Sequence, residues 1–129
     1  MSRAVERHED ILRKLAIRDD AYVGSILARE DESGGASALD PRTRSLIGLA
    51  AMITMDAAPP SYLAAVEAGL ACGVTKDEMV GVLVAVTPTV GLARVVSAAP
   101  KLALALGYDL VLALEERTEG RSSLWEGVR

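Results

Sequence analysis

The chain has 129 residues, a formal net charge of -4 and a single cysteine. This length fits one domain with its own core, and the acidic balance argues against a nucleic-acid partner, because phosphate backbones are bound by clustered Lys and Arg. Cys72 alone cannot form an intrachain disulfide, and the charged N-terminal stretch does not resemble a signal peptide, so we expect a cytoplasmic protein.

The apolar composition predicts close packing between helices. Hydrophobic residues make up 50% of the chain, but aromatic residues only 3%, with no Phe, so Ala, Val, Leu and Ile must build the core. The longest uncharged run, residues 79–93, is shorter than the roughly 20 apolar residues that span a bilayer. We therefore expect no membrane span.

The N-terminal part predicts two amphipathic helices and a loop. Apolar residues recur at helical spacing within 3–17 and again within 22–27, after a break near Asp19 and Asp20. The stretch EDESGGASA at 30–38 has no such period and two adjacent glycines, which is typical of a surface loop. We therefore divide the chain into N-terminal helices and a loop at 1–38, a helical domain at 39–117 and a C-terminal tail at 118–129.

Two clear helix starts follow the loop. Asp40 before Pro41 predicts an N-cap and a first helical residue, with the helix running to about residue 55. Pro59 and Pro60 fit only the first turn of a second helix or the loop before it, and Gly73 is the residue type that ends helices.

A capping box predicts the next helix. Thr75 followed three residues later by Glu78 is that motif, and we expect the helix to end or kink near Pro88 and Gly91. A helix at 92–106 with an interruption at Pro100, and a last helix capped by Asp109 and running to about 116, complete the expected fold. No alternating strand pattern occurs, so the chain is predicted to be all-α.

The charge distribution predicts self-association. Between residues 45 and 100 only six residues are charged, and three of them belong to the capping turn. Helices that are apolar on all sides need cover on all sides, and one domain of this size cannot supply it. The charged residues of this stretch are Asp56, Glu67, Lys76, Asp77, Glu78 and Arg94.

Three segments together resemble the carboxymuconolactone decarboxylase family, which includes the alkylhydroperoxidase D branch. They are LDPRTRSLIGLA at 39–50, AGLACGVTKDEM at 68–79 and VGVLVAVTPTVGLARVV at 80–96. The likeness covers about residues 39–106. It implies a single-domain helical bundle of the alkylhydroperoxidase D-like type, assembled into a homotrimer or homohexamer. It also implies a small-molecule pocket near the subunit contacts.

The reactive residues of the family are missing. The peroxidase branch uses a CxxC pair with a histidine one helical turn later, whose lowered thiol pKa produces the attacking thiolate. Counted back from Gly73, these positions fall on Ala58, Ser61 and Ala65, and a register shift of one residue finds only Ala64. The resemblance therefore supports the fold, and cysteine peroxidase activity is not expected.

Other reactive side chains have simple structural interpretations. Cys72 precedes the helix-ending Gly73, where the helix dipole disfavours a thiolate, so we interpret it as structural. His8 stands alone among charged residues, which fits a solvated side chain, and Glu67 fits a surface or interface charge. We expect no bound metal and no cofactor.

Arg94 is the main candidate for substrate binding. It follows a long uncharged stretch, so its guanidinium needs an anionic or carbonyl partner. That partner is either a protein carboxylate, such as Asp56, Glu67 or one from a neighbouring subunit, or a substrate carboxylate held by the guanidinium fork. Ser61 and Tyr62 are further substrate-binding candidates, or else a helix cap and a packing residue.

The catalytic candidates are Asp56, Thr87 and Thr89. Asp56 is the one plausible acid–base group of the presumed pocket, and the two threonines flank Pro88, where they either face a cavity or bond to carbonyls that the proline frees. Two functions remain open on this reading. One is binding of a small carboxylate or lactone, with lyase or decarboxylase activity on it; the other is a non-catalytic oligomeric scaffold or ligand-binding module.

Overall fold

The computed structural model describes residues 3–28, 38–108 and 118 of the chain. In these residues all regular structure is α-helical, and the contacts divide the chain into two compact units, Met1–Ala38 and Leu39–Arg129. The first unit contains α1 (Arg3–Ala16) and α2 (Asp20–Leu27). The second contains α3 (Pro41–Met55), α4 (Pro59–Ala71), α5 (Lys76–Val90) and α6 (Leu92–Ala105). The all-α prediction is confirmed.

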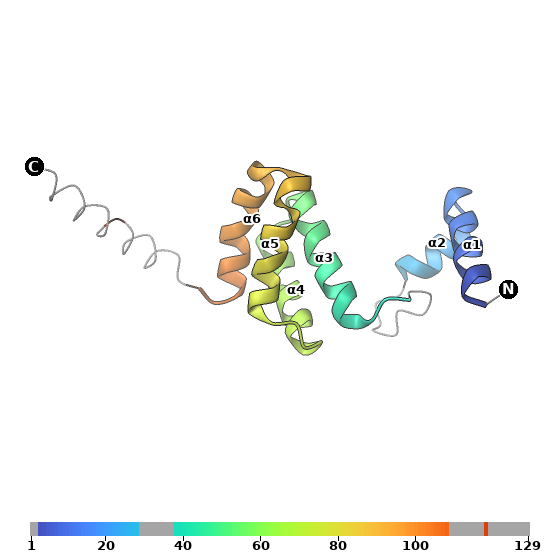
Figure 1. Cartoon of the computed structure of the whole chain (residues 1–129), viewed down its shortest axis with the longest axis horizontal. Helices are drawn as coiled ribbons and strands as arrows, with labels where there is room; N and C mark the ends of the chain where they lie inside the picture. Colours follow the sequence, from blue (N-terminus) through green and yellow to red (C-terminus); the bar gives the residue numbers. More distant parts are fainter. Residues whose placement is uncertain (1–2, 29–37, 109–117, 119–129) are drawn as a thin grey trace, which may run out of the picture. The chain divides into compact units, whose positions relative to one another are not determined.

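The second unit is a four-helix bundle (Figure 1). Around the bundle the helices follow the order α3, α4, α6, α5, so that α4 and α5, which are consecutive in the chain, occupy opposite corners. The buried core comes from all four helices and the α4–α5 turn, and it contains one aromatic ring. Its buried residues are Leu49, Ile53, Tyr62, Val66, Val74, Met79, Leu83, Ala98 and Leu102.

Small residues bring the helices together, as the composition predicts. Gly69 of α4 is buried, and a Cβ placed there would lie 2.7 Å from Cε of Met79 and 3.0 Å from Oγ of Ser45. These distances are shorter than normal van der Waals contacts, so a Cβ at position 69 would require the Met79 methyl and the Ser45 hydroxyl to move away from α4.

The helix starts lie where the sequence places them. The Asp40 side chain accepts a hydrogen bond of 2.7 Å from the Thr43 amide, ahead of Pro41 at the start of α3. The capping box of α5 is complete: Thr75 Oγ1 accepts from the Glu78 amide, and Glu78 Oε1 accepts from the Thr75 amide, both at 3.1 Å. Each cap satisfies amides that have no partner within the helix.

The helix of the capping box ends at Gly91, as expected, but Pro100 does not interrupt the next helix. Pro88 lies inside α5, which ends at Gly91 with φ of 90°, and Pro100 lies inside α6. Both prolines are exposed, so each ring lies on the outside of the bundle and packing of the opposite helix face holds the backbone helical. The helix expected at 109–116 and most of the tail lie outside the described residues.

Within the described ranges, no helix has the length and apolar character needed to cross a membrane.

Candidate binding site

The candidate site is built around Asp56, at the end of α3. Asp56 is the C-cap residue and has left-handed backbone angles, φ of 54° and ψ of 52°. Aspartate tolerates this conformation better than most non-glycine residues, because its short polar side chain can form local hydrogen bonds. The left-handed turn ends α3, and the Asp56 carboxylate contacts one face of α6.

Three side chains of α6 converge on that carboxylate. Asp56 Oδ1 accepts hydrogen bonds from Ser97 Oγ at 2.7 Å and from Lys101 Nζ at 3.0 Å. Asp56 Oδ2 lies 3.5 Å from Nη1 of Arg94. Residues 94, 97 and 101 are spaced by three and four positions, which places them on one face of a helix. We call these four residues the Asp56 cluster.

Lys101 also ties the cluster to the α3–α4 loop. Its ammonium donates a second hydrogen bond, of 3.0 Å, to the carbonyl of Ala57. Its side chain is only 22% exposed, whereas the side chain of Arg94 is 50% exposed. Lys101 is therefore fixed by two protein oxygens, whereas half of the Arg94 side chain remains exposed to solvent.

The hydrogen bonds from Ser97 and Lys101 lower the pKa of Asp56, and the charges of Lys101 and Arg94 act in the same direction. The carboxyl group is therefore ionised at neutral pH and is a weak base. With Asp56 at -1 and two cations beside it, the Asp56 cluster carries a surplus positive charge of about one.

Tyr62 lies in the core below this region. The residue is fully buried, and its hydroxyl has no hydrogen-bond partner among the described protein groups. Burial raises the pKa of Tyr62, and the negative charge of Asp56 raises it further. Tyr62 is thus a neutral phenol with an unused donor, and its ring belongs to the central packing of α4.

The remaining candidates lie apart from these contacts. Thr87 is half-buried and donates to the carbonyl of Leu83 at 2.7 Å, which is the bonding back along the helix considered as the structural alternative. Thr89 is exposed near the end of α5, and Ser61 is exposed in the first turn of α4. Of the six sequence candidates, the structure brings Asp56 and Arg94 into direct contact.

Sequence reasoning missed Ser97 and Lys101. Lys101 lies one position beyond the sparsely charged stretch of residues 45–100. The signal was present, because Arg94, Ser97 and Lys101 follow the three- and four-residue spacing of one helix face.

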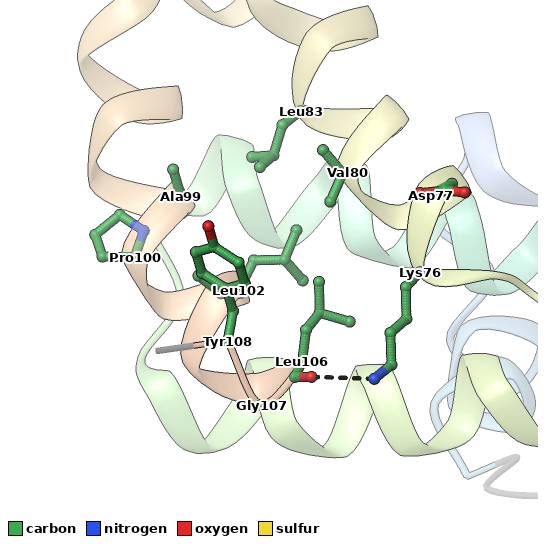
Figure 2. A pocket seen from close by; sticks show the side chains of 11 residues that line it. Lys76, Asp77, Val80, Leu83, Ala99, Pro100, Leu102, Leu106, Gly107 and Tyr108 are labelled. Atoms are coloured by element: carbon green, nitrogen blue, oxygen red, sulfur yellow. Dashed lines mark hydrogen bonds between the residues drawn. The ribbon is translucent and has the colours of Figure 1, made fainter. Parts of the chain in front are cut away.

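A separate apolar groove lies between α5 and α6 (Figure 2), with a volume of about 730 Å³. Lys76 borders it, with Nζ donating to the Leu106 carbonyl at 3.2 Å. None of the six sequence candidates lines this groove.

In the described part of the chain no group of His, Cys, Asp and Glu side chains is placed to hold a metal ion, and Cys72 is a free, half-buried thiol.

The fold and the Asp56 cluster define an all-α bundle with a positively charged polar site between α3 and α6. The family model of the carboxymuconolactone decarboxylase family matches residues 23–104. The chain therefore belongs to this family, as the resemblance at 39–106 indicates, and the match also includes part of α2. No curated protein and no solved structure gives a significant match to the chain.

Proposed function

We propose that this protein binds a small carboxylate, or a lactone that opens to one, at the Asp56 cluster. One observation carries the proposal: two cations meet a single carboxylate, and the half-exposed Arg94 holds its carboxylate at the long distance of 3.5 Å. A guanidinium has five N–H donors, so Arg94 can bind a ligand carboxylate through its free donors while Lys101 neutralises Asp56.

The charges of the Asp56 cluster favour binding of a carboxylate over lyase activity on it. General acid–base catalysis works best with a group whose pKa lies near the working pH. The pKa of Asp56 is lowered by its hydrogen bonds, which makes it a poor proton donor and a weak base at neutral pH. The cluster therefore supports anion binding better than it supports proton transfer.

Calorimetric titration with succinate tests the proposal, with the neutral γ-butyrolactone titrated in parallel. A charge-assisted hydrogen bond contributes about 1.5–3 kcal/mol, so Arg94→Ala should weaken succinate binding by about ten-fold or more. Arg94→Lys should restore binding only in part, because lysine keeps the charge and loses the planar fork. Arg42→Ala is the matched control, since Arg42 is a similarly exposed arginine that pairs with Glu78 elsewhere in the bundle.

The scaffold alternative predicts different results for the same variants. If Arg94 serves only to pair with Asp56, wild-type protein and Arg94→Ala will both show no heat with succinate. In that case Arg94→Ala changes only the free energy of unfolding. No succinate binding by the wild-type protein, or equal binding by wild type and Arg94→Ala, would overturn the proposal.

We also propose that the protein works as a homo-oligomer, a trimer or hexamer, in the cytoplasm. Large apolar side chains remain exposed on several faces of the four-helix unit, among them Val84 at 71%, Leu92 at 68% and Leu104 at 71%. Apolar surface of this kind is normally covered by a partner. Light scattering coupled to size exclusion at low micromolar concentration measures the mass, and a sharp monomer peak would contradict this proposal.

A further inference from the structure

The two oxygens of the Asp56 carboxylate have different surroundings. Oδ1 accepts two hydrogen bonds, from Ser97 Oγ at 2.7 Å and from Lys101 Nζ at 3.0 Å. Among the described residues, the polar contact of Oδ2 is Nη1 of Arg94 at 3.5 Å, which is longer than the roughly 2.7–3.2 Å of an ordinary N–H···O bond. Each carboxylate oxygen has room for about two donors. Oδ1 is therefore saturated, and Oδ2 can accept further hydrogen bonds.

This unused acceptor lies beside an unused donor. The Asp56 side chain is 38% exposed and the Arg94 side chain is 50% exposed, so solutes can reach both groups. The hydrogen bonds from Ser97 and Lys101 lower the pKa of Asp56, so the carboxylate stays ionised at neutral pH and can only accept. The Arg94 guanidinium can only donate. The Asp56 cluster therefore presents to solvent a donor and an acceptor that are 3.5 Å apart.

A ligand that satisfies both groups needs an acceptor and a donor that are equally close together. A carboxylate alone can bind Arg94, but its oxygens carry no hydrogen and repel the Asp56 carboxylate beside it. A hydroxyl on the carbon next to the carboxyl group supplies the missing donor, because only two bonds separate the hydroxyl oxygen from the carboxyl carbon. A hydroxyl further along a flexible chain loses more conformational entropy when it is held in place.

The charges of the cluster favour a hydroxyl over an amine as that donor. Lys101 and Arg94 bring two positive charges against the single negative charge of Asp56. A hydroxycarboxylate is an anion and balances this surplus. An amino acid has no net charge in its backbone groups, and its ammonium group is repelled by both cations.

We propose that the Asp56 cluster selects a 2-hydroxycarboxylate, with Arg94 binding the carboxylate and Asp56 Oδ2 accepting a hydrogen bond from the hydroxyl. Ser97 and Lys101 are positioning residues, since their bonds to Oδ1 fix the Asp56 side chain and leave Oδ2 for the ligand. This inference rests on the proposed function, because it names the class of carboxylate that the same site binds.

Calorimetric titration with malate and succinate tests the proposal. Malate is succinate with a 2-hydroxyl group in place of one hydrogen, and both acids have the same charge at neutral pH. A hydrogen bond to a charged group should make the preferred enantiomer of malate bind about ten-fold more tightly than succinate. Aspartate, which has an ammonium group in place of that hydroxyl, should bind more weakly than malate. Arg94→Ala should weaken binding of malate and of succinate.

Two variants at position 56 test the acceptor. Asp56→Gly fits the left-handed backbone and removes the carboxylate, so malate and succinate should bind within about two-fold of each other, and succinate should bind no more weakly than to wild type. Asp56→Asn also fits this backbone and keeps a neutral acceptor, so it should retain a preference for malate of about three-fold. Circular dichroism verifies that each variant is folded.

The outcomes separate this inference from the proposed function. If wild type binds succinate and both enantiomers of malate equally, and Arg94→Ala weakens all three, the inference is overturned and the proposed function stands. A ten-fold preference for malate that persists in Asp56→Gly and Asp56→Asn would also overturn the inference, because the hydroxyl would then bind elsewhere. If wild type binds neither acid, the proposed function fails and the inference fails with it.

Discussion

Replacement of Tyr62 by phenylalanine should leave the protein as stable as before or make it more stable. The Tyr62 ring is completely buried among core residues, and its hydroxyl lacks a hydrogen-bond partner among the described groups. A buried polar group without a partner costs about 1–3 kcal/mol. Phenylalanine keeps the ring contacts and removes that cost, so Tyr62→Phe should raise the free energy of unfolding by up to about 2 kcal/mol.

Urea unfolding and thermal unfolding measure this change directly. For a chain of this size a gain of that magnitude corresponds to a rise in melting temperature of roughly 4–10 °C. Tyr62→Leu is the control, because it removes ring volume from the same site and should cost about 2–4 kcal/mol through the cavity it leaves. A loss of more than about 1 kcal/mol in Tyr62→Phe would refute the reasoning, since it would mean that the hydroxyl donates a bond in the folded protein.

The same variant also has a binding readout. If the hydroxyl of Tyr62 reaches a carboxylate bound at the Asp56 cluster, Tyr62→Phe will weaken succinate binding without lowering stability. A residue that only packs in the core will show unchanged binding. The two measurements together therefore separate the two roles that the sequence left open for Tyr62.

Three further predictions concern packing, pH and redox chemistry. Gly69→Ala should destabilise the protein by about 1–3 kcal/mol by crowding Met79. Gly81→Ala, at an exposed helical position with open space around it, should stabilise the protein by about 0.5–1 kcal/mol. Equal effects of the two variants in chemical denaturation would argue against the close approach of Gly69 to Met79. The pKa of Asp56 is lower in the folded protein than its unfolded value of about 3.9. The ionised carboxylate therefore stabilises the fold fully above about pH 3.9, and this stabilisation disappears as the pH falls through the folded pKa. Asp56→Asn should flatten the plot of unfolding free energy against pH between these two values, and an unchanged acid side of that plot would contradict the prediction. Finally, the protein should reduce no organic hydroperoxide with a dithiol reductant, and turnover that disappears in Cys72→Ser would show that expectation to be wrong.

Local signals in the sequence predicted most of the helix boundaries. Asp40 with Pro41, and Thr75 with Glu78, act through backbone hydrogen bonds within one turn, so the sequence alone specifies them. Pro100 was misjudged for the same reason. Its local effect is to interrupt a helix, but packing of the rest of α6 against the bundle decides the outcome.

The site was only partly predictable, because its members come from distant parts of the chain. Arg94 was found by its isolation among apolar residues, and Asp56 was named as one of its possible partners. That Lys101 shares the same carboxylate depends on how α3 ends against α6, across a separation of 45 positions. No local pattern specifies that pairing, since it depends on how the helices pack in the bundle.

The left-handed conformation of Asp56 limits which substitutions can follow at that position. Glycine and asparagine fit the backbone at φ of 54° but remove the charge, whereas glutamate keeps the charge and strains the turn. Any replacement therefore leaves Lys101 and Arg94 with an unmatched positive charge or disturbs the end of α3. Related chains without aspartate at this position should also have changed residue 101 or residue 94, so variation at these three positions should be coupled.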